Sequence, residues 1–418
     1  MGFISVLLFL SFLPPLLILL AFPYRGKFGT NASIVFTISL CILIGIYLLY
    51  FGQSMVYRNM KLPREWDFLA FWTFAQVGNS GLDFYKPENF QALQLPWTAT
   101  KDFILDTLDV GFLYPPATMF LFLPLAWFGL TQGFLLWYAA IFGAMATSIV
   151  LLWKLFLKNE GFPGLAFSAA LVVFFPPTKF TLHYGQTLFF ALCALLIFWG
   201  RPKSMKGGAS LGIGLLIKPL FAVLLLVPAV KKSWRTLAGF FAVTSALWIL
   251  AILYFGFGTV HSYFTEKPQA KFPFSVYLEP VNQSVSSLFL KMGYMPIGLS
   301  PVLTYPYIIV TLIMLFLTAW AVFRCPNEES EWALCLTVLL ALLIYPGSQT
   351  HYGVLGLPAV FLIWKNRQRL RGGPWTIPIS LSAIYAVDGL GFVLVGNMIL
   401  WISVLILSPG LPWSKRTI

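Results

Sequence analysis

Long runs of apolar residues dominate this chain and leave few ways for it to fold. We predict membrane helices near residues 3–22, 33–51, 133–153, 163–177, 186–200, 236–257, 301–323, 332–346, 352–364, 376–394 and 397–411. Only 10% of the 418 residues are charged, whereas soluble domains carry about 25%. So few charges could not cover the surface of a water-soluble fold. The sequence therefore excludes a soluble enzyme, a nucleic-acid-binding protein and a disordered chain. It predicts one all-α, polytopic membrane domain over residues 1–418, with about 11 full spans.

Two further apolar runs, 113–129 and 208–230, are interrupted by prolines. The first opens with Tyr114-Pro115-Pro116, and the second contains Lys218-Pro219 near its centre. Proline cannot continue a helical hydrogen-bond ladder. Non-helical backbone at membrane depth is tolerated only where protein buries it or where it lines a wet cavity. We therefore expect two broken or re-entrant segments, and full crossings would be the alternative.

The charge distribution predicts which side of the membrane each loop occupies. If the loop 52–112 lies outside the cytoplasm and neither broken segment crosses fully, 17 basic and four acidic residues fall on the cytoplasmic side, and nine basic and ten acidic residues on the other. The remaining basic residue, Lys218, lies within an apolar run. Cytoplasmic loops carry an excess of Lys and Arg. The pattern thus indicates a first outer loop at 52–112 with juxtamembrane helices, and a second at 258–300.

The first outer loop contains Asp67 within the aromatic stretch Glu65-Trp66-Asp67-Phe68-Leu69-Ala70-Phe71-Trp72. Such a segment could lie flat on the bilayer. A carboxylate flanked by apolar surface can have a raised pKa, which suits a general base. A solvated loop acid or a helix N-cap is the simpler interpretation, and each Trp can equally be an interface anchor.

Lys218 is the most unusual residue because it lies inside an apolar run. Ionisable groups at membrane depth are costly and usually functional. Snorkelling to the interface would be the structural alternative, whereas a cation facing a cavity would suit a lipid phosphate. No Gly-rich nucleotide loop is present, and three His without carboxylate spacing do not indicate a metal site.

The order of several short motifs resembles glycosyltransferase family 87 of the GT-C superfamily of membrane glycosyltransferases. These motifs begin with Asp67, Gly81-Leu82-Asp83-Phe84-Tyr85 and Phe112-Leu113-Tyr114-Pro115-Pro116, and they continue through Gly185-Gln186, Lys218-Pro219, Asn282-Gln283-Ser284 and His351. The resemblance implies a GT-C-type helical bundle in the cell (inner) membrane, with its active site on the non-cytoplasmic side. It also implies a polyprenyl-phosphate sugar as donor, with mannose as the hexose, and inverting transfer to a glycolipid or glycan acceptor. No cofactor or metal is expected, and no nucleic-acid partner.

The resemblance also implies roles for individual residues. Asp67 would be the general base, with Glu65 as the competing acid. The donor phosphate would contact Lys218 and His351, with Lys179 and His183 behind them. Sugar or acceptor contacts would come from Glu65, Trp66, Asp83, Tyr114, Gln186, Asn282 and Gln283, of which Asn282 and Gln283 could instead order the outer loop. We expect Asp67 and Lys218 to face the same pocket.

Three other functions share parts of this pattern. A transporter or flippase of a lipid-linked sugar would use the same spans and phosphate-binding cations, but usually shows internal repeats. A related transferase could move arabinofuranose or glucose. A structural assembly partner would need neither an acid-rich outer loop nor a lysine within an apolar run.

Overall fold

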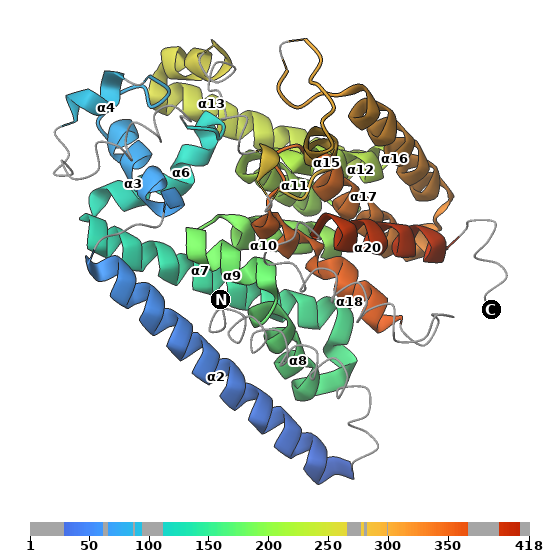
Figure 1. Ribbon diagram of the computed structural model, residues 1–418. Helices are drawn as coiled ribbons and strands as arrows, with labels where there is room; N and C mark the ends of the chain where they lie inside the picture. The colour runs from blue at the N-terminus through green and yellow to red at the C-terminus, as the bar shows by residue number, and fades with distance from the viewer. Residues whose placement is uncertain are drawn as a thin grey trace.

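The described part of the chain is a helical bundle (Figure 1). The computed structural model describes residues 29–61, 66–86, 88–93, 112–265, 277–279, 282–298, 300–366 and 393–409. Within these ranges there is no β-strand, only an isolated antiparallel bridge between Asn282 and Gln349. The prediction of an all-α fold is therefore confirmed for the described residues. The predicted run 3–22 and most of 376–394 lie outside them.

The helices fall on the described apolar runs, although α2 continues beyond the predicted run 33–51 to Lys61, into the predicted first outer loop. Their bounds are α2 Gly29–Lys61, α3 Trp66–Asn79, α4 Glu88–Ala92, η3 Pro116–Thr118, α6 Met119–Phe122, η4 Leu123–Trp127, α7 Leu130–Leu152, η5 Trp153–Leu157, η6 Lys158–Glu160, α8 Gly161–Val173, α9 Pro176–Tyr184, α10 Leu188–Gly200, α11 Met205–Ile217, η7 Pro219–Leu225, α12 Leu226–Val230, α13 Trp234–Thr265, α15 Val285–Lys291, α16 Tyr305–Arg324, η9 Asn327–Glu329, α17 Ser330–Ile344, η10 Thr350–Gly356, α18 Leu357–Lys365 and α20 Val393–Leu407.

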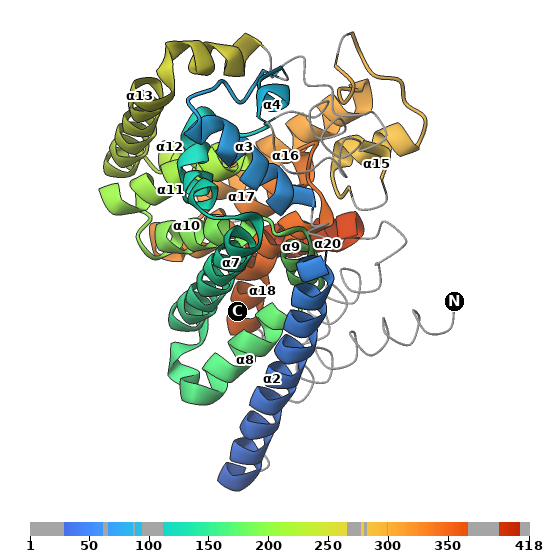
Figure 2. The same cartoon turned by 90° about the vertical axis from the view of Figure 1, so that its left-hand side faces the viewer.

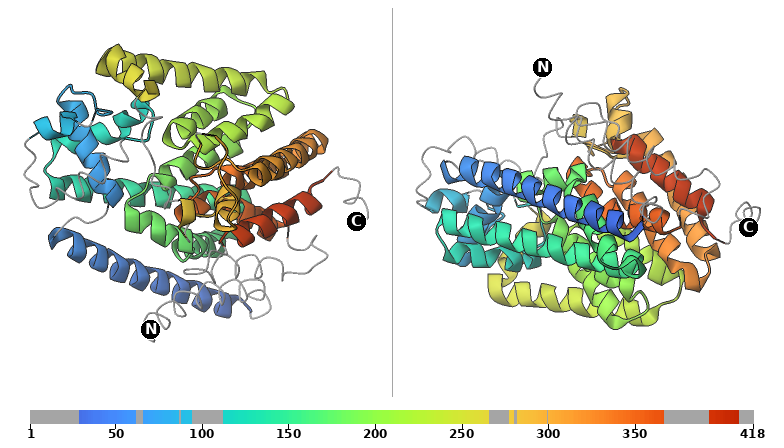
Figure 3. Two further views of the ribbon diagram at one scale, coloured as in Figure 1. Left: turned by 45° about the horizontal axis from the view of Figure 1, so that its top comes forward. Right: turned by 90° about the horizontal axis from the view of Figure 1, so that it is seen from below.

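Three described stretches are long and apolar enough to cross a membrane: Leu130–Val173, Trp234–Thr265 and Tyr305–Arg324. Shorter apolar helices account for most of the other predicted runs, so the total of about 11 spans stays a prediction. Seen from below, the axes of α2, α7 and α13 are roughly aligned (Figure 3). The long helix α2 stands at the edge of the bundle, where it packs on α8 (Figure 2).

Both broken runs are interrupted where the sequence predicts it. The first consists of the short pieces η3, α6 and η4, and Pro116 begins it. In the second, α11 ends at Ile217, Lys218 is extended (φ −143°, ψ 118°) and Pro219 opens η7. The Thr118 hydroxyl donates a 2.6 Å hydrogen bond to the Leu216 carbonyl. One broken segment therefore satisfies a carbonyl that the break in the other leaves free.

The aromatic stretch after Glu65 is built into the protein core. It forms α3, and the side chains of Phe68, Leu69, Phe71, Trp72 and Phe74 are buried in the main hydrophobic core. Rings of η3–η4 and α7 cover this helix, among them Phe122 stacked on Phe71 with centroids 4.2 Å apart, and the orientation of the stretch relative to a membrane stays a prediction. Residues 66–79 thus belong to the bundle.

Glycines let α11 approach α13 closely. A Cβ atom on Gly208 would collide with the Thr236 carbonyl oxygen of α13, and one on Gly212 would lie 2.8 Å from Thr244 Oγ1. Small residues four apart allow two helix backbones to meet closely in membrane proteins. This contact holds α11, and therefore the break at Lys218, against the long helix α13.

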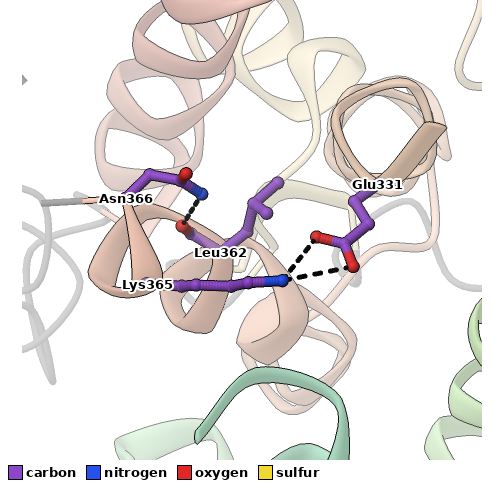
Figure 4. A network of polar contacts seen from close by, with 4 residues as sticks. All are labelled: Glu331, Leu362, Lys365 and Asn366. Carbon is purple, nitrogen blue, oxygen red and sulfur yellow. Dashed lines mark hydrogen bonds and ion pairs between the residues drawn. The ribbon is translucent and has the colours of Figure 1, made fainter. Parts of the chain in front are cut away.

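Side-chain contacts join segments that the charge pattern places on one side of the membrane. On the predicted outer side, Ser262 donates a 2.6 Å hydrogen bond to Asp83 Oδ2. On the predicted cytoplasmic side, Lys365 at the end of α18 contacts both carboxylate oxygens of Glu331, at 3.2 and 3.4 Å (Figure 4). Exposed pairs like this stabilise little, but they fix which helix ends are neighbours.

Replacing Gly208 by Ala should weaken the bundle, because the new methyl group must push α11 away from α13. We expect a loss on the order of 1–3 kcal/mol, typical of overpacking, seen as a lower thermal unfolding midpoint of the purified protein. Gly143→Ala in α7 is the matched control, since nothing lies within 4 Å of its added Cβ. Equal midpoints for both variants would contradict the close approach.

Candidate active site

A carboxylate, an amide and an ammonium group form a hydrogen-bonded chain inside the bundle. Gln186 Nε2 donates to Asp67 Oδ2 at 2.5 Å, and Lys218 Nζ donates to Gln186 Oε1 at 3.1 Å. Lys218 and Gln186 are buried, at 3% and 7% exposure, whereas Asp67 is half-buried. Gln186 thus links Asp67 and Lys218, two residues that the sequence singles out separately.

Helix α3 holds Asp67 in place. Asp67 lies in the first turn of this helix, where the backbone N–H groups favour a negative charge. Two side chains further along α3 bind this helix to the second half of the first broken run, 113–129. Trp72 Nε1 donates to the Phe128 carbonyl and Gln76 Nε2 to the Ala126 carbonyl, each at 3.2 Å.

A tight turn between α9 and α10 positions Gln186. Gly185 closes α9 in the left-handed conformation (φ 66°), which glycine adopts without strain. Trp137 Nε1 donates to the Gly185 carbonyl at 2.7 Å, and the Tyr138 hydroxyl donates to the Leu182 carbonyl at 2.8 Å. Both aromatic residues come from α7. The turn that carries Gln186 is therefore fixed on both sides by buried hydrogen bonds.

Lys218 lies between two tyrosines at the break of the second run. Its Nζ donates to the Tyr114 hydroxyl at 3.0 Å, and it sits 5.0 Å from the Tyr114 ring centroid and 4.7 Å from that of Tyr352. Aromatic faces attract cations, more strongly where water is excluded. Lys218 does not snorkel to an interface, because its charge is compensated inside the protein.

Burial raises the pKa of the Asp67 carboxyl to about 6, while the hydrogen bond from Gln186 and the charge of Lys218 act in the opposite direction. The carboxylate still predominates at neutral pH. A carboxylate with a raised pKa is a stronger base than an ordinary aspartate. The arrangement can therefore accept a proton at Asp67 while a cation lies one amide away.

The other predicted phosphate ligands differ in how they relate to the Asp67–Gln186–Lys218 hydrogen bonds. His351 is buried in η10, and its ring centroid lies 4.9 Å from that of Tyr352 and 5.9 Å from that of Tyr184. His183, on α9, contacts the Tyr184 ring at 5.1 Å. Lys179 is exposed on α9. His351 thus borders the site through Tyr352, whereas the Lys179 side chain points to the surface.

Asn282 and Gln283 order the outer segments, which was one of their two expected roles. Asn282 Nδ2 donates to the Pro346 carbonyl at 2.9 Å, and its Oδ1 accepts from the Ser284 amide and hydroxyl. Gln283 Nε2 donates to the Gln349 carbonyl at 2.7 Å, and its Oε1 accepts from Asn397. Both side chains are buried. Their amides clamp the turn before η10, the element that carries His351, and the sugar-contact role stays a prediction.

Asp83 is also used within the protein. Its Oδ1 accepts from the Tyr85 amide at 2.9 Å, and its Oδ2 accepts from Ser262. The neighbouring Tyr85 hydroxyl donates to the Tyr114 carbonyl at 2.6 Å. Asp83 therefore joins the first outer loop to α13 and is not part of the Asp67 chain. Glu65 and the side chain of Trp66 lie outside the described residues.

The match to a family model covers residues 112–346 and carries the description glycosyltransferase family 87. It spans more than half of the chain. The chain belongs to glycosyltransferase family 87. Membership makes it a membrane glycosyltransferase, and the resemblance noted in the sequence is confirmed. The matched residues include Tyr114, Gln186 and Lys218, whereas Asp67 and His351 lie outside them. No curated protein and no solved structure matches the chain.

Sequence reasoning missed Tyr352 as a contact of the site in this family member. Tyr352 directly follows His351, which the sequence analysis singled out, but an interface tyrosine carries no special signal. Only the packing of η10 against α9 shows that its ring faces Lys218. Within the described residues, no three His, Cys, Asp or Glu side chains gather as metal ligands. The absence of a metal cofactor stays a prediction.

Asp67 and Lys218 should be energetically coupled. Asp67→Asn and Lys218→Met should each destabilise the protein, because either change leaves one buried charge without its counterpart. The double variant should lose less than the sum of the two, by on the order of 0.5–3 kcal/mol. Unfolding free energies of the four proteins in one detergent would measure this, and strict additivity would contradict the coupling.

Proposed function

We propose that this enzyme transfers a hexose, mannose by its family resemblance, from a polyprenyl-phosphate sugar to an acceptor hydroxyl of a glycolipid or glycan. The reaction inverts the anomeric configuration and takes place on the non-cytoplasmic side of the cell membrane. One observation carries the proposal, namely the chain from Asp67 through Gln186 to Lys218, which sets a base beside a cation.

In the proposed step, the acceptor hydroxyl attacks the anomeric carbon from the face opposite the phosphate. Asp67 takes the hydroxyl proton as the new C–O bond forms. The bond between the anomeric carbon and the phosphate oxygen breaks, and its electron pair leaves on polyprenyl phosphate. Because the leaving group is already a stabilised anion, no strong general acid is needed. The base is therefore the residue most sensitive to substitution.

Lys218 is suited to the charge that develops on the leaving phosphate. An ammonium group has three N–H donors, and described residues accept two of them, at Tyr114 and Gln186. A phosphate oxygen would take the third. Since Lys218 is buried, the donor headgroup must displace the side chains that cover it, and the Tyr114 and Tyr352 rings are in contact with Nζ. A fixed cation at such a position lowers the barrier by electrostatic stabilisation.

The surroundings of this site support the proposal of a lipid-linked donor. The segments that carry it are apolar and lie among membrane-capable helices. The chain contains no Gly-rich loop that would cradle a soluble nucleotide sugar. The excess of basic residues on the opposite side supports a non-cytoplasmic location.

Asp67→Asn should reduce transfer by about 100- to 10,000-fold, the usual contribution of a general base. The assay follows radiolabelled mannose from polyprenyl-phosphate mannose into product, using purified protein and a membrane extract as acceptor source. Asp83→Asn is the matched control, because the Asn oxygen still accepts from the Tyr85 amide and its NH₂ group can donate to the Ser262 hydroxyl oxygen, and it should keep most of its activity. An active Asp67→Asn variant would move the base role to another acid such as Glu65. Transport of intact donor without any transfer would instead support a flippase.

The wild-type rate should fall as the pH drops through about 6, because protonation of Asp67 removes the base. The donor is a phosphodiester and stays ionised over this range. The fall in rate on the acidic side of the pH–rate profile, its acid limb, therefore reports on the enzyme. Initial rates of mannose transfer between pH 4.5 and 8, with protein integrity checked at each pH, would measure it. A flat profile across pH 6 would argue against Asp67 as the base.

A further inference from the structure

We infer that Gln186 is a positioning residue that fixes which way the Asp67 carboxylate faces. Lys218 sets the orientation of the Gln186 amide by donating a hydrogen bond to the amide oxygen. This assignment rests on the proposed function, since it presupposes Asp67 as the base. It replaces the expectation from the sequence that Gln186 contacts sugar or acceptor, because both ends of its amide are engaged within the protein.

Chemistry alone determines the orientation of the amide. A lysine ammonium can only donate hydrogen bonds, so the group that meets it at 3.1 Å must be the amide oxygen, Oε1. The opposite end is then the NH₂ group, which must donate to Asp67. A glutamine that faced two carboxylates or two hydroxyls could flip freely. Here the cation forbids the flip, and Asp67 always meets a donor.

The donor holds one carboxylate oxygen and leaves the other for the substrate. Oδ2 receives the 2.5 Å hydrogen bond from Gln186, and no described residue donates to Oδ1. Asp67 as a whole residue is half-buried. Catalytic groups must be held to within about 0.5 Å of the productive geometry. Gln186 supplies that restraint without itself taking a proton.

The backbone beneath Gln186 is unusually well fixed for a turn. Its own N–H donates to the Thr181 carbonyl at 2.9 Å, and the preceding carbonyl of Gly185 accepts from Trp137. The Cα of Gln186 therefore cannot move without breaking buried hydrogen bonds. A rigid support of this kind is expected for a residue whose task is to hold a base in place.

Other titratable groups interact with Asp67 or Lys218 and must be considered in any pH measurement. Within the described residues, Tyr114 and Tyr352 interact electrostatically with Asp67, and His351 interacts with Lys218. None of these groups contacts the Gln186 amide through a described hydrogen bond. A change confined to Gln186 therefore alters the environment of Asp67 while the other titratable groups stay in place.

The test compares two glutamine-to-methionine changes that preserve side-chain length. Gln186→Met removes the donor to Asp67, and Gln76→Met removes the hydrogen bond from the same helix α3 to Ala126. We expect Gln186→Met to lower kcat by roughly 10- to 100-fold, with little change in KM for polyprenyl-phosphate mannose. Its acid limb should move to higher pH, because the lost hydrogen bond lowers the pKa of Asp67 in the wild type. Gln76→Met should leave the acid limb where it is.

The position of the acid limb does not depend on the amount of folded protein, so partial misfolding cannot imitate the result. An unchanged limb in Gln186→Met, or an equal shift in Gln76→Met, would overturn the positioning role. Gln186→Glu provides a second measure, because a carboxylate there would pair with Lys218 and repel Asp67, moving the limb further upward. Asp67→Asn in the same assay separates the two hypotheses. If that variant is active, the proposed base fails; if it is inactive while Gln186→Met behaves as wild type, only the positioning role fails.

Discussion

The burial of the Lys218 ammonium group is the constraint on which the rest of the site depends. A charge removed from water is costly unless nearby groups compensate it. Here the compensation comes from Tyr114, Gln186 and Tyr352, which belong to three separate segments, and through Gln186 from Asp67. Because one ammonium group needs all of them, these segments must converge at a single point. The position of the base is thus tied to the position of the cation.

The broken helices make this convergence possible. In an unbroken helix, residue 218 would keep a helical backbone. Instead Lys218 is extended, and the backbone leaves the axis of α11 at this residue. The 13 residues of α11 span about 20 Å, so the break lies well away from the basic residues that precede this helix. Thr118 satisfies the Leu216 carbonyl near the break. Such repair by a hydroxyl side chain is how membrane proteins tolerate interrupted helices.

Local chemistry made the helices, the breaks and the two charged residues predictable. Proline interrupts a helix wherever it falls, and a lysine in an apolar run is conspicuous in any sequence, so Lys218 could be recognised without coordinates. The roles of amide side chains could not be predicted in the same way. Asn282 and Gln186 are both buried amides in outer segments, yet one clamps a turn and the other contacts the candidate base. Their partners lie 64 and 119 residues away in sequence. Only tertiary packing decides which of these roles an amide takes.

The placement of a neutral amide between the base and the cation also has an electrostatic consequence. A lysine in direct contact with Asp67 would favour the charged carboxylate and lower its pKa, which would make it a weaker base. With Gln186 between them, the attraction acts over a longer distance and weakens accordingly. Burial then outweighs it, and the pKa of Asp67 stays raised. At the same time Lys218 keeps a donor for phosphate that a bidentate ion pair could have consumed. Separation by one amide thus lets a base and a phosphate-binding cation lie in one buried site without neutralising each other.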